Sequence, residues 1–425
     1  MSTTSEKVRD PTVGEAMDVY GEKFVWTSEH MLRKELDPLM FTYDELAANA
    51  YECALQLFNE EQEKLKAEEG GEANKKPKRP VKPDIFQIVK DNAATQPALG
   101  KLWEHVNTVP DWVDWNQLGR AQKVFYRYGV ANLMSLGYQS LFVGMAAWRI
   151  VEVLLRTGGF SPAAAKKRSF ETAQWVLEIM RDVDSIRPGG AGWESTVRVR
   201  LLHSAVRYRI SEMAKAKPEY FNTEEWGVPI NDLDSAATIC SFSTAPILSG
   251  LPRQKIKMRK QEIADYIALW RYIAYLIGAP ERFFATPDSA KKLQESMIYY
   301  ELDPNENSRV LADNLLKSFI GQPPFYAPAG LINAAARCLA GEKLSNELGV
   351  AKVNLIWRGL WSGNTTMYKG YAYMCRSIPW FDKGNIKMMR KLTWKIVVEG
   401  KHGLGGERSK FPMKYQPSYD RTKAD

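Results

Sequence analysis

The chain has 425 residues, of which 45% are hydrophobic and 25% are charged, and it contains 29 glycines and 22 prolines. This length and composition exclude collagen-like, disordered and disulfide-scaffold proteins and allow a large buried core. The formal net charge of +8 permits attraction to anionic partners but identifies none, and we expect no nucleic-acid partner.

Cysteine usage and the N-terminal residues bear on the cellular compartment. Cys53, Cys240, Cys338 and Cys375 are far apart and form no CxxC pair, which argues against zinc modules and disulfide frameworks. Residues 1–23 lack the apolar run of a secretory signal peptide. We therefore expect a cytoplasmic protein that is not secreted. Peripheral contact with an intracellular membrane stays open.

The chain divides at two charged stretches with few apolar side chains. Residues 1–59 are predicted to form an N-terminal helical segment. Residues 60–83 are charged and punctuated by Gly and Pro, so we expect a flexible linker there. Residues 84–400 form the predicted main domain, and residues 401–425 are expected to form a loose tail.

Between Arg127 and Arg149 the sequence contains no charged residue, which is close to the roughly 20 residues that span a bilayer. Amides, hydroxyls and glycines interrupt the segment, as at Asn132, Gln139 and Gly144. This pattern predicts a pair of buried helices and not a helix that faces lipid.

Elsewhere in the main domain, apolar residues recur at helical spacing. Ser161 and Pro162, for example, supply a helix start before residue 163. The predicted helices cover residues 118–128, 141–156, 163–181, 195–215, 260–276, 289–300, 307–319 and 328–339. The sequence has no series of alternating strands and no internal repeat, so we predict an all-α fold with a single large helical domain.

Several common catalytic motifs are missing. The sequence contains neither GxxxxGK[ST] nor GxGxxG, and neither GxSxG nor HExxH, so nucleotide-binding, serine hydrolase and zincin chemistry lose their support. The four histidines, His30, His105, His203 and His402, are dispersed. A site with several histidine ligands is therefore hard to build.

His203 stands in a distinctive setting on the predicted helix 195–215. Val199 and Val206 share its face at helical spacing, and Arg200 and Arg207 flank it by one turn on each side. One imidazole, an apolar wall and two guanidinium groups suit a flat apolar macrocycle with carboxylates, such as haem. The alternative is a core histidine satisfied by hydrogen bonds, beside two arginines that pair with acidic neighbours.

The two preceding predicted helices carry polar side chains that are candidates for a role in catalysis. Arg168 and Thr172 share a helical face, with Glu171 beside them. Glu152 lies among apolar residues, a costly place for a carboxylate unless it is paired, and one way to obtain a base. A structural Glu152–Arg168 ion pair is an equally good interpretation of the pattern.

These residues resemble the haem-b rubber oxygenase family, also called latex clearing proteins, and the fungal oxygenases that cleave a prenyl side chain in mycophenolic acid biosynthesis. The resemblance covers roughly residues 105–280. Its elements are Val109-Pro-Asp-Trp-Val-Asp114, RxxxT at residues 168–172, RxxHxxxR at residues 200–207, Trp226-Gly-Val-Pro-Ile-Asn-Asp232 with Asp234 and Thr238, and residues 270–278. No single element is specific, but their order and spacing make the set strong.

The resemblance implies a helical domain built around a haem pocket, with haem b as the iron cofactor and His203 as the iron ligand. It places Arg200 and Arg207 near the propionates, Arg168 and Thr172 on the distal side, and makes Glu152 a candidate base. One position departs from the family pattern. Where bacterial members carry a lysine directly before the threonine, this chain has Glu171, which is a further acid or base candidate.

The resemblance therefore predicts a haem-dependent oxidoreductase that uses O₂ to oxidise or cleave a carbon–carbon double bond of an apolar, isoprenoid substrate. Because we expect no export, a small prenylated metabolite or lipid fits better than an external polymer. The alternative is a non-catalytic carrier of haem, a lipid or an isoprenoid, which Glu171 in place of lysine keeps open.

Overall fold

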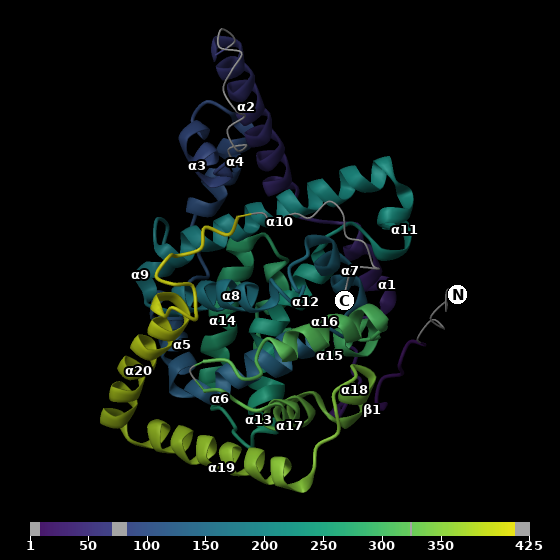
Figure 1. The fold of residues 1–425 in the computed structure, drawn as a ribbon, viewed down its shortest axis with the longest axis vertical. Coiled ribbons are helices and arrows are strands. Elements are labelled where there is room, and N and C mark those ends of the chain that lie inside the picture. The colour runs from purple at the N-terminus through teal and green to yellow at the C-terminus, as the bar shows by residue number, and fades with distance from the viewer. Residues whose placement is uncertain (1–8, 70–82, 324, 413–425) are drawn as a thin grey trace.

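The computed structural model describes residues 9–69, 83–323 and 325–412. Over these residues the regular secondary structure is almost entirely helical, and the strands there form one antiparallel hairpin near the N-terminus (Figure 1). In the hairpin, Ala16 pairs with Val25 and Val19 with Glu22. The all-α fold class predicted from the sequence is confirmed.

The elements follow in chain order. The first part contains β1 (Ala16–Val19), β2 (Glu22–Val25), α1 (Arg33–Leu36), η1 (Asp37–Met40), α2 (Glu45–Glu69), α3 (Ile85–Asn92), α4 (Pro97–Asn107) and α5 (Trp115–Arg127). The middle part contains α6 (Gly129–Met134), η2 (Ser135–Phe142), α7 (Trp148–Thr157), α8 (Ala165–Met180), α9 (Val183–Ile186), α10 (Ala191–Ala216), η3 (Pro218–Tyr220), α11 (Thr223–Trp226), α12 (Asp232–Phe242), η4 (Ala245–Gly250) and α13 (Leu251–Arg253). The last part contains α14 (Lys260–Ile277), η5 (Glu281–Phe284), α15 (Pro287–Glu301), α16 (Glu306–Lys317), α17 (Ala329–Ala340), α18 (Glu342–Glu347), α19 (Leu355–Ser377), α20 (Pro379–Trp394) and η6 (Lys395–Glu399).

Each predicted helix has an observed counterpart. The main difference concerns the predicted helix 141–156, of which the first residues belong to the π-helix η2. A turn at Met145 and Ala146 then separates it from α7, which begins at Trp148. Residues 195–215 fall within α10, which begins four residues earlier, at Ala191.

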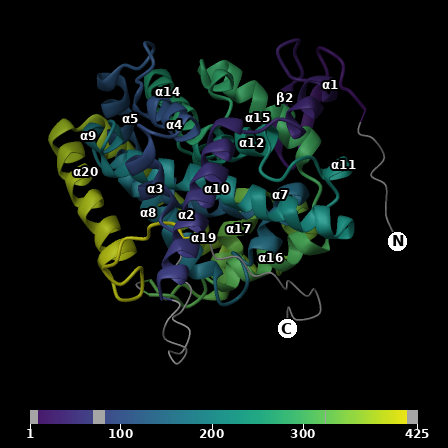
Figure 2. The same ribbon diagram turned by 90° about the horizontal axis from the view of Figure 1, so that it is seen from above.

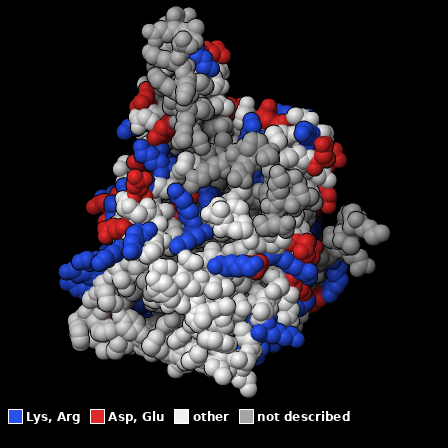
Figure 3. Space-filling model, viewed as in Figure 1, with Lys and Arg blue, Asp and Glu red and all other residues white. Residues whose placement is uncertain are grey.

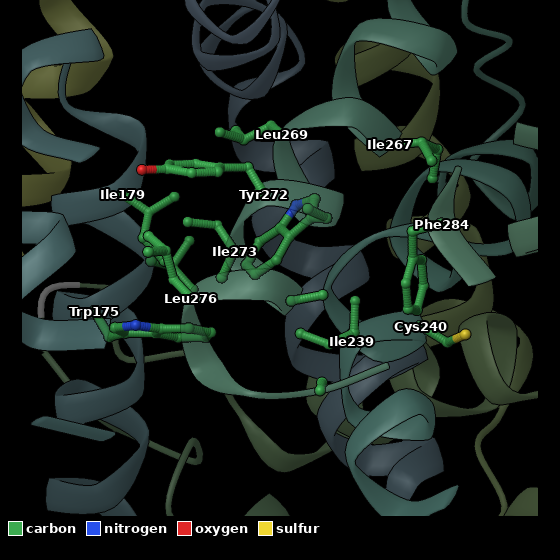
Figure 4. Packing of buried hydrophobic residues seen from close by; sticks show 14 of the residues in the cluster. Trp175, Ile179, Ile239, Cys240, Ile267, Leu269, Tyr272, Ile273, Leu276 and Phe284 are labelled. Carbon is green, nitrogen blue, oxygen red and sulfur yellow. The ribbon is translucent and has the colours of Figure 1, made fainter. Parts of the chain in front are cut away.

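Helix α14 runs through the main core. Tyr266, Trp270, Tyr272 and Ile273 all have no exposed surface, as expected of a helix that is apolar on most of its faces. Helices α5 and α10 pack against α14. In the close view, Trp175 of α8 lies near Ile273 and Leu276 of α14, so α8 belongs to the same core (Figure 4).

Helices α8 and α10 approach each other closely because of a glycine. A Cβ on Gly192, in the first turn of α10, would lie 2.9 Å from the Glu178 carbonyl oxygen and 3.1 Å from the Ile179 Cα. Nearby, Trp175 Nε1 donates a hydrogen bond to Thr196 Oγ1 across 3.0 Å. This crossing fixes the spacing of the two helices that carry most of the predicted site residues.

The uncharged segment between Arg127 and Arg149 forms α6 and the π-helix η2, followed by a turn. Phe142 and Met145 have no exposed surface, and the polar Asn132 and Gln139 are buried as well. The prediction that this segment forms buried helices is confirmed. None of the helices among the described residues is both long and apolar enough to cross a bilayer.

The predicted segments differ from the structure at three places. The N-terminal segment 1–59, predicted to be helical, contains the β1–β2 hairpin before α1. Helix α2 continues to Glu69, so the first ten residues of the expected linker are helical, while residues 70–82 lie outside the described residues. The expected loose tail packs on α8 at residues 408–411. The backbone N–H of Ser409 donates to Gln174 Oε1 across 2.8 Å, and Phe411 is buried. Residues 413–425 lie outside the described part.

Helices α19 and α20 border the molecule, and the sequence did not predict them. In Figure 1, α19 lies along the lower edge and α20 along the left edge, and Figure 2 also places α20 on the outside. Trp361, Thr365, Ala372 and Cys375 face inward from α19. Because α19 carries apolar side chains on exposed faces too, its helical periodicity is weak in the sequence.

Candidate active site

His203 lies in the middle of α10. The ring is only partly buried, and so are Val199, Leu202 and Val206 on the same face. Even so, desolvation, followed by the charges of Arg207 and Arg168, lowers the pKa of His203 to about 4. The imidazole is therefore neutral at pH 7, which is the form that binds metals.

Arg207, one turn further along α10, is buried and incompletely satisfied. Its Nε donates to the Pro229 carbonyl oxygen across 3.2 Å, and its Nη2 donates to that of Ile230 across 2.8 Å. The guanidinium also lies 4.8 Å from the centre of the Tyr43 ring. Its Nη1 has no hydrogen-bond partner. A buried N–H without a partner is costly, so this atom suits an anionic group of a ligand.

All three guanidinium nitrogens of Arg200 donate hydrogen bonds to groups of the protein. Its Nε and Nη2 donate to the two carboxylate oxygens of Asp44 across 2.6 and 2.8 Å, and its Nη1 donates to the Leu276 carbonyl oxygen. The alternative of an arginine paired with an acidic neighbour therefore describes Arg200. The observed contacts of Arg200 join α10 to the start of α2 and to the end of α14. Contact between Arg200 and a ligand carboxylate stays a prediction.

Helix α8 contributes Arg168, Glu171 and Thr172. Arg168 Nη1 lies 3.4 Å from Glu171 Oε2, and Glu171 Oε1 accepts a hydrogen bond from Ser409 Oγ across 3.2 Å. The Glu171 side chain is only 3% exposed, so it does not face solvent. Thr172 is partly buried. The charge of Arg168 is one of the causes that lower the pKa of His203.

Glu152 belongs to a second polar cluster on α7. Its Oε2 accepts a hydrogen bond from Arg156 Nη1 and its Oε1 one from Asn307 Nδ2, each across 2.6 Å. The Arg156 guanidinium in turn lies 5.1–5.2 Å from the ring centres of three aromatic residues, Tyr220, Phe221 and Trp226. The ion-pair partner found for Glu152 is therefore Arg156, one turn away, and the pattern had suggested Arg168.

A small apolar cluster connects α7 to α10. Val153, Ile210 and Phe221 pack together, with Val206 against them. Since Val153 follows Glu152 and Val206 lies one turn beyond His203, the helices that carry Glu152 and His203 meet near both residues. Helix α10 therefore packs against α8 and meets α7 through this small cluster.

The sequence prediction missed Arg156, Asn307, Ser409 and Asp44. Arg156 could have been found, because it follows Glu152 at i+4, the spacing of helical ion pairs. Asn307, Ser409 and Asp44 are each more than 150 residues from their partners. A single sequence carries no signal for contacts of that separation.

These residues fit a haem better than a bare metal ion. Among the described residues no group of three or more His, Cys, Asp or Glu side chains gathers as a metal site. His203 offers one neutral nitrogen beside an apolar helix face, and Arg207 offers an unsatisfied donor to a carboxylate. A cavity of about 10 Å³ near α7 does not include His203 among its lining residues. A porphyrin-sized space beside His203 stays a prediction.

Comparisons with known proteins agree on one family. A family model described as "ER-bound oxygenase mpaB/B'/Rubber oxygenase, catalytic domain" matches residues 115–374, more than half of the chain. The rubber oxygenase of Streptomyces sp. (strain K30) is 22% identical over 262 residues, which cover 61% of this chain and 62% of that relative. The match thus spans less than two thirds of the relative's own length.

A solved structure shows the same fold. The structure of the latex clearing protein LCP in the closed state superimposes with a TM-score of 0.58 and 18% sequence identity, covering 88% of this chain and 94% of that chain. The family model includes α5 through most of α19, and thus α7, α8 and α10 with all the candidate site residues. The chain belongs to the mpaB and rubber oxygenase catalytic-domain family.

Proposed function

We propose that this protein is a haem-b-dependent oxygenase that uses O₂ to oxidise or cleave a carbon–carbon double bond of an apolar, isoprenoid substrate. Family membership supports oxygenase activity in general. The observation that carries the haem assignment is the pair formed by His203 and Arg207. A desolvated neutral imidazole and a buried guanidinium N–H without a partner lie one turn apart on one helix.

In this proposal His203 would bind the haem iron and Arg207 Nη1 would donate to a carboxylate of the cofactor. When bound, haem supplies the redox-active iron that O₂ chemistry requires. The face of α10 around His203, with Val199, Leu202 and Val206, restricts water and gives an apolar substrate a wall to pack on.

Glu152 would accept an allylic proton from the substrate at a carboxylate oxygen. Arg156 and Asn307 hold this carboxylate in one orientation. The rings around Arg156 fix the guanidinium, so the geometry does not depend on a flexible arginine.

Glu171 is the second candidate for proton transfer. It is buried and held between Arg168 and Ser409, and Arg168 and Thr172 would orient oxygen or the base from the same helix. An acid at this position cannot serve as a neutral amine ligand in the way the lysine of the bacterial relatives would. The distal side of this protein would therefore differ from theirs.

The test is turnover by the purified, haem-supplied protein with O₂ and a small farnesyl or geranyl compound, followed by mass spectrometry. Carbonyl products that incorporate label from ¹⁸O₂ are expected. Glu152→Gln should reduce their rate about 10²–10⁴-fold if Glu152 is the base, and Glu171→Gln should do so if Glu171 is. The control is Glu306→Gln, on an exposed carboxylate, which should retain full activity.

Haem binding without any product would overturn the oxygenase assignment. It would favour the alternative, a non-catalytic carrier of haem, a lipid or an isoprenoid. Binding of a prenyl compound by a protein that takes up no haem would favour the carrier as well, since the apolar face of α10 needs no iron to hold such a chain.

A further inference from the structure

Helices α19 and α20 carry a continuous basic region of the sequence. Between Gly349 and Val398 the chain has nine Lys and Arg residues and one acidic residue, Asp382. That carboxylate is already neutralised, because Arg127 donates to both of its oxygens across 3.0 and 2.7 Å. No other acidic side chain between Gly349 and Val398 neutralises the lysines and arginines of this region, so the outer side of the two helices is positively charged.

The exposed side of α20 has two parallel rows. Trp380, Met388 and Leu392 recur at helical spacing and are 76%, 50% and 44% exposed. The second row, one position away, consists of exposed lysines four residues apart, at positions 383, 387 and 391 of α20 and at 395, where η6 begins. We call these the apolar row and the lysine row. The opposite face of α20 packs on the core through Ile386 and Met389.

Helix α19 continues the apolar surface. Its side chains Leu355, Ile356, Leu360, Met367 and Met374 are between 39% and 83% exposed. Most of them lie three, four or seven residues apart, so they fall on one flank of the helix. At the lower edge of Figure 3, where α19 lies, the surface is mostly white with blue side chains and no red.

Large exposed apolar side chains beside rows of lysine are typical of helices that lie in a membrane interface. The apolar row can enter the boundary of headgroups and acyl chains, while the lysine row meets anionic headgroups. We propose that the outer face of α19 and α20 docks this protein on an anionic lipid bilayer. The inference does not depend on the proposed function, since docking requires no turnover.

A second copy of the chain is a poorer occupant of this face. In a two-fold dimer, the same patch meets itself, so each lysine row would lie close to the lysine row of the other copy. Like charges would then oppose the contact. An anionic bilayer complements both the apolar row and the lysine row.

The experiment is flotation of the purified full chain with vesicles of phosphatidylcholine alone or with 30% phosphatidylserine. Binding to the anionic vesicles should be at least tenfold stronger than to the neutral ones. The triple variant K383E/K387E/K391E should lose at least tenfold of that binding. The variant W380S/M388S/L392S, which keeps the charge, should lose the binding that remains at high salt.

The matched control is K64E/K66E/K101E, which makes the same change in net charge at three exposed lysines outside this face. It should bind as the unaltered protein does. No binding to anionic vesicles, or an equal loss in both triple charge variants, would overturn the proposal. So would a dimer in light scattering that W380S/M388S/L392S dissociates, because a second copy would then cover the face. Circular dichroism checks that each variant is folded.

Discussion

At the scale of single residues, the carboxylate of Glu152 depends on Arg156. Both side chains are less than 10% exposed, and three aromatic rings surround the guanidinium. A buried pair of this kind contributes little net stability over an apolar pair, but loss of one partner leaves a buried charge. The main effect of the pair is thus to fix the orientation of the Glu152 carboxylate, and its net contribution to the free energy of unfolding is small.

Arg156→Met should reduce the free energy of unfolding by roughly 3 kcal/mol or more. Glu152→Gln in the same chain should restore at least half of that loss, because it removes the isolated charge. Chemical denaturation measures both values. Lys317→Met, which breaks an exposed pair with Asp313, should cost less than about 0.5 kcal/mol. An Arg156 variant as stable as the unaltered protein would contradict this account of the pair.

Asp234 of α12, which lines the same small cavity as Arg149, gives a prediction for pH. Burial, opposed by Arg149 and Asn231, raises the pKa of Asp234 to about 6, above its ordinary value of 3.8. Between these pH values the folded protein holds a proton that the unfolded chain releases, so stability falls as pH rises through this window. Above pH 6 the cost is up to roughly 3 kcal/mol, at 1.36 kcal/mol per pKa unit.

Asp234→Asn removes the buried charge. The variant should therefore be more stable than the unaltered protein at pH 7, and the difference should disappear near pH 3.5, where the aspartate of the unaltered protein is protonated as well. Urea denaturation at the two pH values measures this. A gain of the same size at both pH values would show that Asp234 is not the titrating group.

At the scale of elements, the close crossing of α8 and α10 sets the spacing of the site. Gly192→Ala places a Cβ against the backbone of Glu178 and Ile179, which cannot move without shifting α8. It should destabilise the protein by roughly 1–3 kcal/mol, as overpacking does. Gly363→Ala in α19, where a Cβ meets no atom within 4 Å, should instead stabilise by up to about 1 kcal/mol.

Thermal unfolding of the two alanine variants gives opposite shifts in Tm if this is correct. Gly192→Ala should also weaken the proposed binding of haem beside α8 and α10. Gly363→Ala should leave haem binding unchanged. Equal stability of both variants would mean that α8 and α10 are not held at the distance the structure gives them.

The same scale shows what the sequence could predict. Helix α10 buries one face and α14 nearly all of its faces, so their apolar spacing is visible in the sequence, and Gly278 marks the end of α14. Helices α19 and α20 were not predicted, because their exposed sides are apolar as well and blur the period of 3.6 residues. The docked residues 408–411 lack any local pattern, since Gln174 and Glu171 of α8 hold them in place.

At the scale of the whole molecule, the site is assembled from distant segments. The sequence analysis identified Arg168 and Glu171, which lie on α8, and His203 and Arg207, which lie on α10. It could not give the partners that orient them. Asp44 reaches Arg200 from the N-terminal segment, and Ser409 reaches Glu171 from the other end of the chain. Long-range hydrogen bonds of this kind depend on the fold and not on local spacing.

The measurement that tests the central claim most directly is the haem content of the purified protein, from its Soret absorption, after expression with added haem. We predict roughly one haem per chain. His203→Ala should lose most of it, and the control His105→Ala, at a half-buried imidazole that stacks on Tyr275, should retain it. A colourless unaltered protein, or undiminished haem in His203→Ala, would contradict the account.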